Sequence, residues 1–190
     1  MASFRSMLGV QPSTASTADS VLVIIDAQNE YAKGKLLISG VETSRVAIAS
    51  LLEKYRAAKA PVIHVVHETP PGAPVFTPGT GLADEFQELK PLENESVVTK
   101  NFPGSFTGTD LQDLLKTTGR SKVVLTGYMA HVCVSTTARQ AAEKGWDVII
   151  VEDAVGDRDI PGSTADEVKR VALNEIADAF GTVIQSKEIQ

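Results

Sequence analysis

The sequence predicts an α/β fold built around a parallel β-sheet, and two patterns lead to this prediction. Short apolar runs rich in β-branched residues recur along the chain, as is typical of strands buried on both faces. Longer segments whose apolar residues recur at helical spacing lie between these runs. Strands that alternate with helices are typical of a parallel sheet covered by helices on both faces.

The predicted strands are apolar runs of four to seven residues. They lie at residues 20–26, 61–67, 96–100, 122–127, 147–152 and 182–185. Ligands of such sheets bind at the carboxyl ends of the strands. Three places therefore stand out before any motif is considered: Asp26, Lys100 and the loop 127–133.

Four predicted helices connect the strands. They span residues 41–59, 109–118, 134–144 and 163–180. The first places apolar side chains at helical spacing, namely Val46, Ile48, Leu51, Leu52 and Tyr55, and the third is rich in alanine. Gly119 and Gly145 directly follow the second and third helices, and glycine is a frequent helix stop.

The domain organisation is simple. A chain of 190 residues fits one domain, which we place at residues 20–190. Residues 1–19 are rich in Ser, Thr and Ala and predict a flexible lead-in along the surface. The proline-rich stretch 68–91 is an unusually long connection, and such loops are often functional, so we expect a wall or lid of the site rather than a plain surface excursion.

Composition excludes several classes of protein. The net charge of −6 argues against nonspecific binding to nucleic acid or to an acidic membrane surface. The single cysteine excludes an intrachain disulfide. We find no signal peptide and no apolar run long enough for a membrane span, so the expected location is cytoplasmic. Release by a route without a signal peptide would leave no trace in the sequence.

Three residues at predicted strand ends carry reactive groups. Cys133 precedes a predicted helix, whose dipole and N–H groups can stabilise a thiolate and an oxyanion; the alternative is an inert buried cysteine. Asp26 is either a general acid or base or a helix cap. Lys100 either stabilises negative charge or is a solvated strand end. Together the three can converge at one edge of a parallel sheet and form a nucleophilic hydrolase site.

Metal and cofactor motifs are not found. The chain has three histidines and no HExxH, phosphate-binding loop or GxGxxG pattern, so we expect no metal and no cofactor. His131 stands two residues before Cys133, where a Cys–His pair is conceivable. Its loop position favours a residue that shapes the substrate-binding site over a base.

Three motifs in order resemble the isochorismatase-like cysteine hydrolase family. VLVIIDAQNEY contains Asp26, VVTKNFPGSFTGTDL contains Lys100, and the stretch from VVLTGYMAHVC onward contains Cys133. The resemblance extends from about residue 20 to 185. It implies a three-layer α/β/α sandwich around a six-stranded parallel sheet, an Asp–Lys–Cys catalytic triad and a homo-oligomer.

The resemblance also implies further site residues. A non-proline cis peptide bond is expected between Tyr128 and Met129, where it would direct the N–H groups of Met129 and Cys133 at one oxyanion. Gln28 and Phe102 match positions that usually line the substrate site.

The resemblance leaves three functions open. The first is hydrolysis of isochorismate, a small anionic substrate, with Asp26 as general acid, Lys100 on a carboxylate or the ether, and Cys133 as a spectator. It is favoured because nicotinamidases of this superfamily carry a metal-binding histidine that residues 31–40 lack. The second is a cysteine-dependent amidase, because well-known isochorismatases have glycine in place of the cysteine. The third is a non-catalytic binding protein, against which the intact triad argues.

Overall fold

A computed structural model describes all 190 residues, and a six-stranded sheet forms its centre. Every pairing between neighbouring strands is parallel, in the order β3-β2-β1-β4-β5-β6. The strands are β1 (Ser20–Ile25), β2 (Val62–His67), β3 (Ser96–Lys100), β4 (Lys122–Gly127), β5 (Asp147–Val155) and β6 (Thr182–Ile184). The predicted α/β class with a six-stranded parallel sheet is therefore confirmed.

Helices connect the strands and cover the sheet. They are α1 (Phe4–Met7), α2 (Glu30–Lys33), α3 (Val41–Ala57), α4 (Leu111–Thr117), α5 (Ser135–Glu143) and α6 (Ala165–Ala179). Short 3₁₀ turns, η1 (Gln87–Leu89) and η3 (Ser186–Glu188), and a π-helical turn, η2 (Ala130–Val134), complete the chain. No helix has both the length and the apolarity that crossing a bilayer requires.

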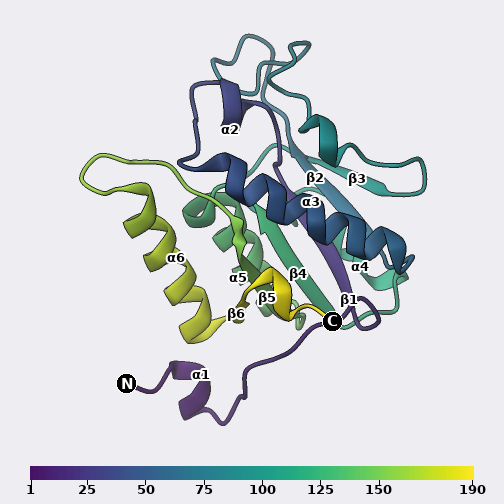
Figure 1. Ribbon diagram of the computed structural model, residues 1–190, viewed down its shortest axis with the longest axis vertical. Helices are drawn as coiled ribbons and strands as arrows, with labels where there is room; N and C mark the ends of the chain where they lie inside the picture. Colours follow the sequence, from purple (N-terminus) through teal and green to yellow (C-terminus); the bar gives the residue numbers. More distant parts are fainter.

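One face of the sheet is covered by α3. Side chains of this helix, among them Ile48, Leu52 and Tyr55, pack against alternate residues of the central strands such as Leu22 and Ile24. The front position of α3 across the strands is visible in Figure 1. Because every residue of β1 is buried, this strand is covered on both faces, as its unbroken apolar run predicts.

The other face is covered by α4, α5 and α6. Its core contains Val23 and Ile25 of β1 together with Leu115 of α4, Ala138 of α5 and Ile176 of α6. The two cores lie on opposite sides of one sheet, so the molecule is the three-layer sandwich that the resemblance implied.

The amino and carboxyl ends of the strands lie at opposite ends of the molecule. Both chain termini lie at one end of the molecule, whereas α2 and the loop 68–91 lie at the opposite end, where β1 finishes (Figure 1). The loop is held to the segment that follows β1: the Phe86 N–H donates to the carbonyl of Ala27, and Gln28 and Glu85 form an isolated antiparallel β-bridge. The loop 68–91 therefore covers one side of the carboxyl ends of β1 and β2.

Residues 1–19 run along the surface and are attached at several points. Arg5 donates to the carbonyl of Gly181 and to the hydroxyl of Thr182. Thr17 and Gln190 pair through their backbones. The segment thus lies against the β6 side of the sheet, far along the chain from the residues that it contacts.

Candidate active site

Asp26 follows the last residue of β1, in the middle of the sheet. Its N–H donates to the carbonyl of Val65 over 2.8 Å, which continues the pairing with β2 for one residue. Its φ angle of 51° is in the left-handed region, which is uncommon for residues other than glycine, although Asp adopts it more readily than most. The turn leaves the carboxylate fully buried at the carboxyl edge of the sheet.

Lys100 ends β3, two strands away from Asp26, and its long side chain reaches across β2. The ammonium Nζ lies 2.8 Å from Oδ2 of Asp26 and 3.4 Å from Sγ of Cys133. Both charged groups of the Asp26–Lys100 pair are buried. A buried ion pair stabilises a fold only weakly, because the cost of desolvation offsets its attraction.

Cys133 lies on the π-helical turn η2, just before α5. The chain reaches this turn through Gly127, whose φ of 111° suits glycine and whose added Cβ would lie 1.9 Å from the carbonyl oxygen of Ile25. The Tyr128–Met129 peptide bond that follows is cis. The N–H of Met129 donates to no acceptor in the protein and is therefore free to bind a ligand.

Burial sets the protonation of the acid and the thiol. Burial raises the pKa of Asp26, and the Lys100 ammonium only partly offsets this effect. Burial, together with the negative charge of Asp26, raises the pKa of the Cys133 thiol to about 12, although Lys100 acts in the opposite direction. At neutral pH the thiol therefore keeps its proton, and Asp26 is the adjacent group that can exchange it.

His67 is a neighbour of the triad that the sequence analysis did not single out. It ends β2, pairs in register with Lys100, and its Nδ1 lies 3.1 Å from the Lys100 ammonium. Burial and the positive charge of Lys100 lower the pKa of His67 to about 4. One signal was present in the sequence: His67 closes a predicted strand, as Asp26 and Lys100 do.

The three other predicted site residues lie at different distances from this centre. Gln28 is buried, and its amide accepts from the His67 N–H and donates to the carbonyls of His67 and Ala83. His131 is partly exposed, and its Nδ1 lies 2.8 Å from both carboxylate oxygens of the buried Asp157. Phe102 is 55 % exposed.

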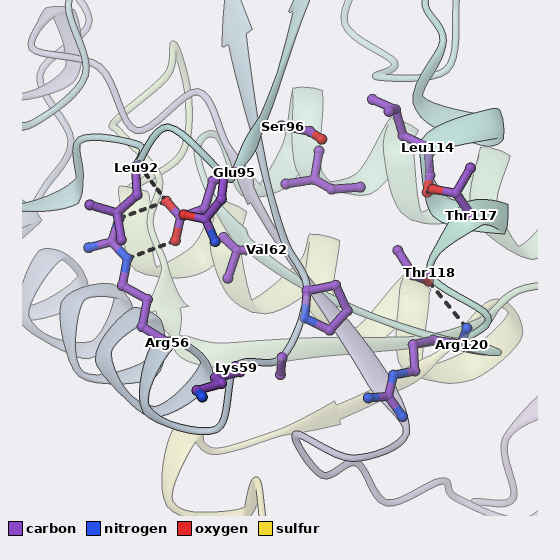
Figure 2. A pocket seen from close by; sticks show the side chains of 14 residues that line it. Arg56, Lys59, Val62, Leu92, Glu95, Ser96, Leu114, Thr117, Thr118 and Arg120 are labelled. Atoms are coloured by element: carbon purple, nitrogen blue, oxygen red, sulfur yellow. Dashed lines mark hydrogen bonds and ion pairs between the residues drawn. The ribbon is translucent and has the colours of Figure 1, made fainter.

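A cavity of about 360 Å³ borders the site beside His67. Gln28, Phe76 and Thr99 also line it. A larger cavity, about 680 Å³, lies elsewhere: residues at the amino ends of β2 and β3 line it, together with Arg56, Glu95 and Arg120 (Figure 2). This cavity thus lies at the amino ends of the strands, whereas Asp26 lies at their carboxyl ends. No group of three or more His, Cys, Asp or Glu side chains is placed to hold a metal ion.

Fold and site together define a class of enzyme. A parallel sheet with a buried carboxylate, ammonium and thiol at its carboxyl edge has the parts for general acid–base and thiol chemistry. The chain matches the isochorismatase domain over residues 20–188. It belongs to the isochorismatase family of hydrolases, as the three motifs predicted.

Curated relatives include fungal and bacterial proteins. The chain is 69 % identical over 189 residues to the secreted isochorismatase effector Isc1 of Verticillium dahliae, with all of both chains covered. It is 31 % identical over 155 residues to a streptothricin hydrolase of Streptomyces noursei, covering 79 % of this chain and 61 % of that protein. The family members therefore differ in the substrates for which they are named.

Solved structures agree with this assignment. The crystal structure of an isochorismatase from Pseudomonas putida matches with a TM-score of 0.96 and 32 % identity, over all of both chains. N-carbamoylsarcosine amidase from Thermoplasma acidophilum matches with a TM-score of 0.79 and 27 % identity, over 90 % of this chain and 99 % of that one.

The expected cytoplasmic location is wrong. A relative with 69 % identity over its full length is named a secreted effector, which points to the outside of the cell. The prediction rested on the lack of a recognisable signal peptide, and that feature does not report on export by other routes.

Proposed function

We propose that this enzyme hydrolyses isochorismate to pyruvate and 2,3-dihydroxy-2,3-dihydrobenzoate, and that it does so outside the cell that makes it. The observation that carries the proposal is the full-length similarity to a secreted isochorismatase effector. The buried Asp26 beside Lys100 supports it because cleavage of an enol ether begins with a proton from an acid.

Asp26 acts as the general acid. Its raised pKa keeps a protonated fraction available at higher pH than an exposed aspartate would. The proton is added to the terminal methylene carbon of the enol ether, which leaves an oxocarbenium ion. Water adds to that cation and forms a hemiketal, which collapses to pyruvate while the former ether oxygen stays on the ring as a hydroxyl. The proton released from water restores Asp26.

Lys100 stabilises the charge that Asp26 gains when it gives up this proton. The ammonium is 2.8 Å from Oδ2 of Asp26 and contacts no solvent. In this reaction Cys133 forms no bond to the substrate, and its thiol is a neighbour that fills the pocket beside the acid.

A second candidate function is hydrolysis of a small amide through a thioester. The observation that favours it is the thiol itself, which lies 3.4 Å from Lys100 and next to Asp26. Asp26 would then accept the proton of Cys133 as sulfur attacks the carbonyl carbon. The free N–H of Met129, with that of Cys133, would bind the oxyanion. Similarity to a streptothricin hydrolase is consistent with this chemistry.

Isochorismate turnover by three proteins separates the candidates. Wild type should release pyruvate, and Asp26→Asn should reduce kcat by about 10³-fold because it cannot donate the proton. Cys133→Ala should stay within about tenfold of wild type if the thiol is a spectator. Pyruvate is measured with lactate dehydrogenase and NADH.

A different set of results would support the amidase function. If wild type releases no pyruvate but frees ammonia from a small amide, and Cys133→Ala lowers that rate by about 10⁴-fold or more, the amidase function replaces the first proposal. An Asp26→Asn variant as active as wild type on both substrates would remove Asp26 from either mechanism.

The location is tested on the producing organism. Culture filtrate and washed cells are compared by immunoblot, with a cytoplasmic enzyme as the lysis control. Enrichment in the filtrate supports export, and exclusive retention in the cells contradicts it. The expected homo-oligomer stays a prediction, which light scattering of the purified protein would check.

A further inference from the structure

The cavity at the amino ends of β2 and β3 has a size and a lining that the catalytic chemistry does not use. Its volume of about 680 Å³ lies within the range of small-molecule sites, about 300–1,000 Å³. Its walls are the end of α3 with the turn into β2, the segment that leads into β3, and the end of α4. None of Asp26, Lys100 and Cys133 lines it. A ligand in this cavity would be bound apart from the triad.

Positive charge is in excess on the walls of this cavity. Three cationic side chains line it, Arg56, Lys59 and Arg120, against one carboxylate, that of Glu95, which leaves an excess of two. Glu95 and Arg56 cancel each other through two 2.8 Å contacts. The Lys59 ammonium and the Arg120 guanidinium have no ion-pair partner in the protein, and Figure 2 shows both at the border of the cavity without a dashed contact from either charged group. This excess occurs in a chain with a net charge of −6.

The helix ends beside these two cations do not need them. A helix C-terminus attracts positive charge through its unpaired carbonyls. Carbonyls in the last turn of α3 accept from the backbone N–H groups of residues 58–60. Carbonyls in the last turn of α4 accept from backbone N–H and hydroxyl groups of residues 117–119. The charged groups of Lys59 and Arg120 therefore keep their donors for a ligand.

The backbone at Lys59 is unfavourable for a lysine. Lys59 directly follows the C-cap of α3 and has a φ of 52°, in the left-handed region that favours glycine at this position. The corresponding residue after α4 is Gly119, with a φ of 68°. Lysine at position 59 thus costs backbone stability while it adds positive charge to the cavity.

Neutral donors and apolar surface complete the lining. The side chains of Asn94 and Ser96 border the cavity and donate to no acceptor in the protein. Pro61, Leu92 and Leu114 add apolar surface, and Leu92 is 50 % exposed. The walls therefore offer charged donors, neutral donors and an apolar surface for a carbon skeleton.

We propose that this cavity binds a small organic dianion, either a phosphate monoester or a dicarboxylate, whose anionic groups pair with Lys59 and Arg120 and whose carbon skeleton packs on Leu92 and Leu114. A phosphate monoester has about −1.5 to −2 charges at neutral pH, and a dicarboxylate has about two, so either matches the excess positive charge. The proposal does not depend on the hydrolase function.

Three probes built on one ring test the charge requirement. Phenyl phosphate and isophthalate are dianions, whereas benzoate has a single charge. Amide chemical shifts of the isotope-labelled full chain, followed by NMR during titration, give both the Kd and the place of binding. We expect the better dianion to bind with a Kd of about 1 mM or lower, and benzoate to bind at least about tenfold more weakly. The amides of Ser96, Thr118 and Arg120 should shift. The tighter of the two dianions identifies the anionic group, and either result supports the site.

Two substitutions test the cations. Arg120→Gln and Lys59→Gly should each raise the Kd of the dianion by about tenfold or more. Lys59→Gly also relieves the left-handed backbone, so its midpoint of thermal unfolding should rise, and weaker binding then cannot come from a damaged fold. Arg170→Gln, at an exposed position of α6, is the matched control and should bind as wild type does.

Three results would overturn the site. They are equal affinity for benzoate and the dianions, an unchanged Kd in both variants, and chemical shifts confined to the surroundings of Asp26 and Cys133. Equal loss of binding in Arg170→Gln would likewise show a general charge effect in place of a site. Turnover of isochorismate or an amide has no part in this test, so a failure of the proposed function leaves its result unchanged.

Discussion

At the scale of single residues, the site combines a strained backbone with groups whose protonation is set by burial. Asp26 adopts a left-handed φ of 51°, and burial raises its pKa. The neighbouring thiol keeps its proton for the same reason. Proton transfer between groups at such short range depends on which of them carries the proton first, so pH distinguishes the two proposed chemistries.

The pH dependence of kcat/KM should have opposite directions for the two reactions. Enol-ether cleavage uses protonated Asp26, so its rate should fall as pH rises through the raised pKa of this group. Thioester formation uses ionised Asp26 as a base, so its rate should fall as pH decreases through the same pKa. The measurement is kcat/KM between pH 4 and 9 on each substrate, with Asp26→Asn expected to lose the dependence.

Gly127→Ala should destabilise the fold and disturb the turn that leads to Cys133. The φ of 111° costs a non-glycine residue about 1–3 kcal/mol. The new Cβ would also lie 1.9 Å from the Ile25 carbonyl oxygen, so the total loss should exceed that of strain alone. Urea unfolding measures it. Gly145→Ala is the matched control, since its φ of 84° is also positive but nothing lies within 4 Å of its added Cβ.

At the scale of elements, the sequence pattern predicted most strands and helices to within about two residues, a precision typical of strongly periodic segments. β1, β2, β3 and β4 were predicted from their apolar runs, although β3 is an edge strand and exposes Val97 instead of burying both faces. β5 was predicted to end at residue 152 but continues to Val155, because Glu152 and Asp153 interrupt the apolar run while the backbone stays paired through Val155 and Gly127.

Contacts between strands could not be predicted from the chain alone. The pattern placed Asp26 and Lys100 at strand ends, but only the strand order and the register bring Lys100 across β2 and beside His67. The same limit applies to His64, whose two ring nitrogens contact Glu85 and Glu95, two separate points of the connection between β2 and β3. Local periodicity determines which face a residue takes, whereas its partners depend on how distant segments are joined.

Glu95 attaches the connection that precedes β3 to α3 and β2. This carboxylate binds Arg56 of α3 through two 2.8 Å contacts and lies 3.2 Å from His64 of β2, so it links three elements. The contacts between Arg56 and Glu95 are drawn in Figure 2. Burial alone would raise the pKa of Glu95, but the hydrogen bonds from Arg56 and from the Leu92 N–H outweigh it and lower that pKa to about 2.

Glu95→Gln should lower the stability at neutral pH by about 1–3 kcal/mol, because it leaves Arg56 and His64 without their charged partner. Since the pKa of Glu95 in the folded protein lies below its ordinary value of 4.5, its contribution to stability is present above that value and is lost as pH falls from about 4.5 towards 2. Urea unfolding at pH 7 and pH 3 should therefore show a smaller difference between the two proteins at the lower pH. Glu93→Gln, an exposed neighbour, is the control, and an equal loss in both variants would contradict the role of Glu95.

At the scale of the whole molecule, the candidate active site and the chain termini lie at opposite ends of the strands of one sheet. Asp26 and Lys100 lie at the carboxyl ends of β1 and β3, and Cys133 lies on η2 after β4. Both termini and the cavity of about 680 Å³ lie at the amino ends of the strands (Figures 1 and 2). Residues 1–19 contact β6 and the C-terminus but none of the triad residues. Stability and activity should therefore respond differently to changes in this segment.

Deletion of residues 2–10 should lower the unfolding free energy by about 1–3 kcal/mol, since the hydrogen bonds of Arg5 to Gly181 and Thr182 are lost. The values of kcat and KM should remain those of the full chain. Thermal unfolding and pyruvate release are the measurements. A deleted protein that folds but loses activity would show that the segment of one subunit serves the site of another, and light scattering of both proteins would then identify the assembly.

The burial of Cys133 also determines how the enzyme ages outside a cell. Peroxide and disulfides react with a thiolate rather than a thiol, and a thiol with a pKa of about 12 supplies very little thiolate at neutral pH. The chain has no second cysteine with which to form an internal disulfide. In an oxidising medium outside the cell, the location proposed above, this sulfur should resist oxidation without a protective reductant, and the working lifetime of the protein there should be limited by unfolding instead.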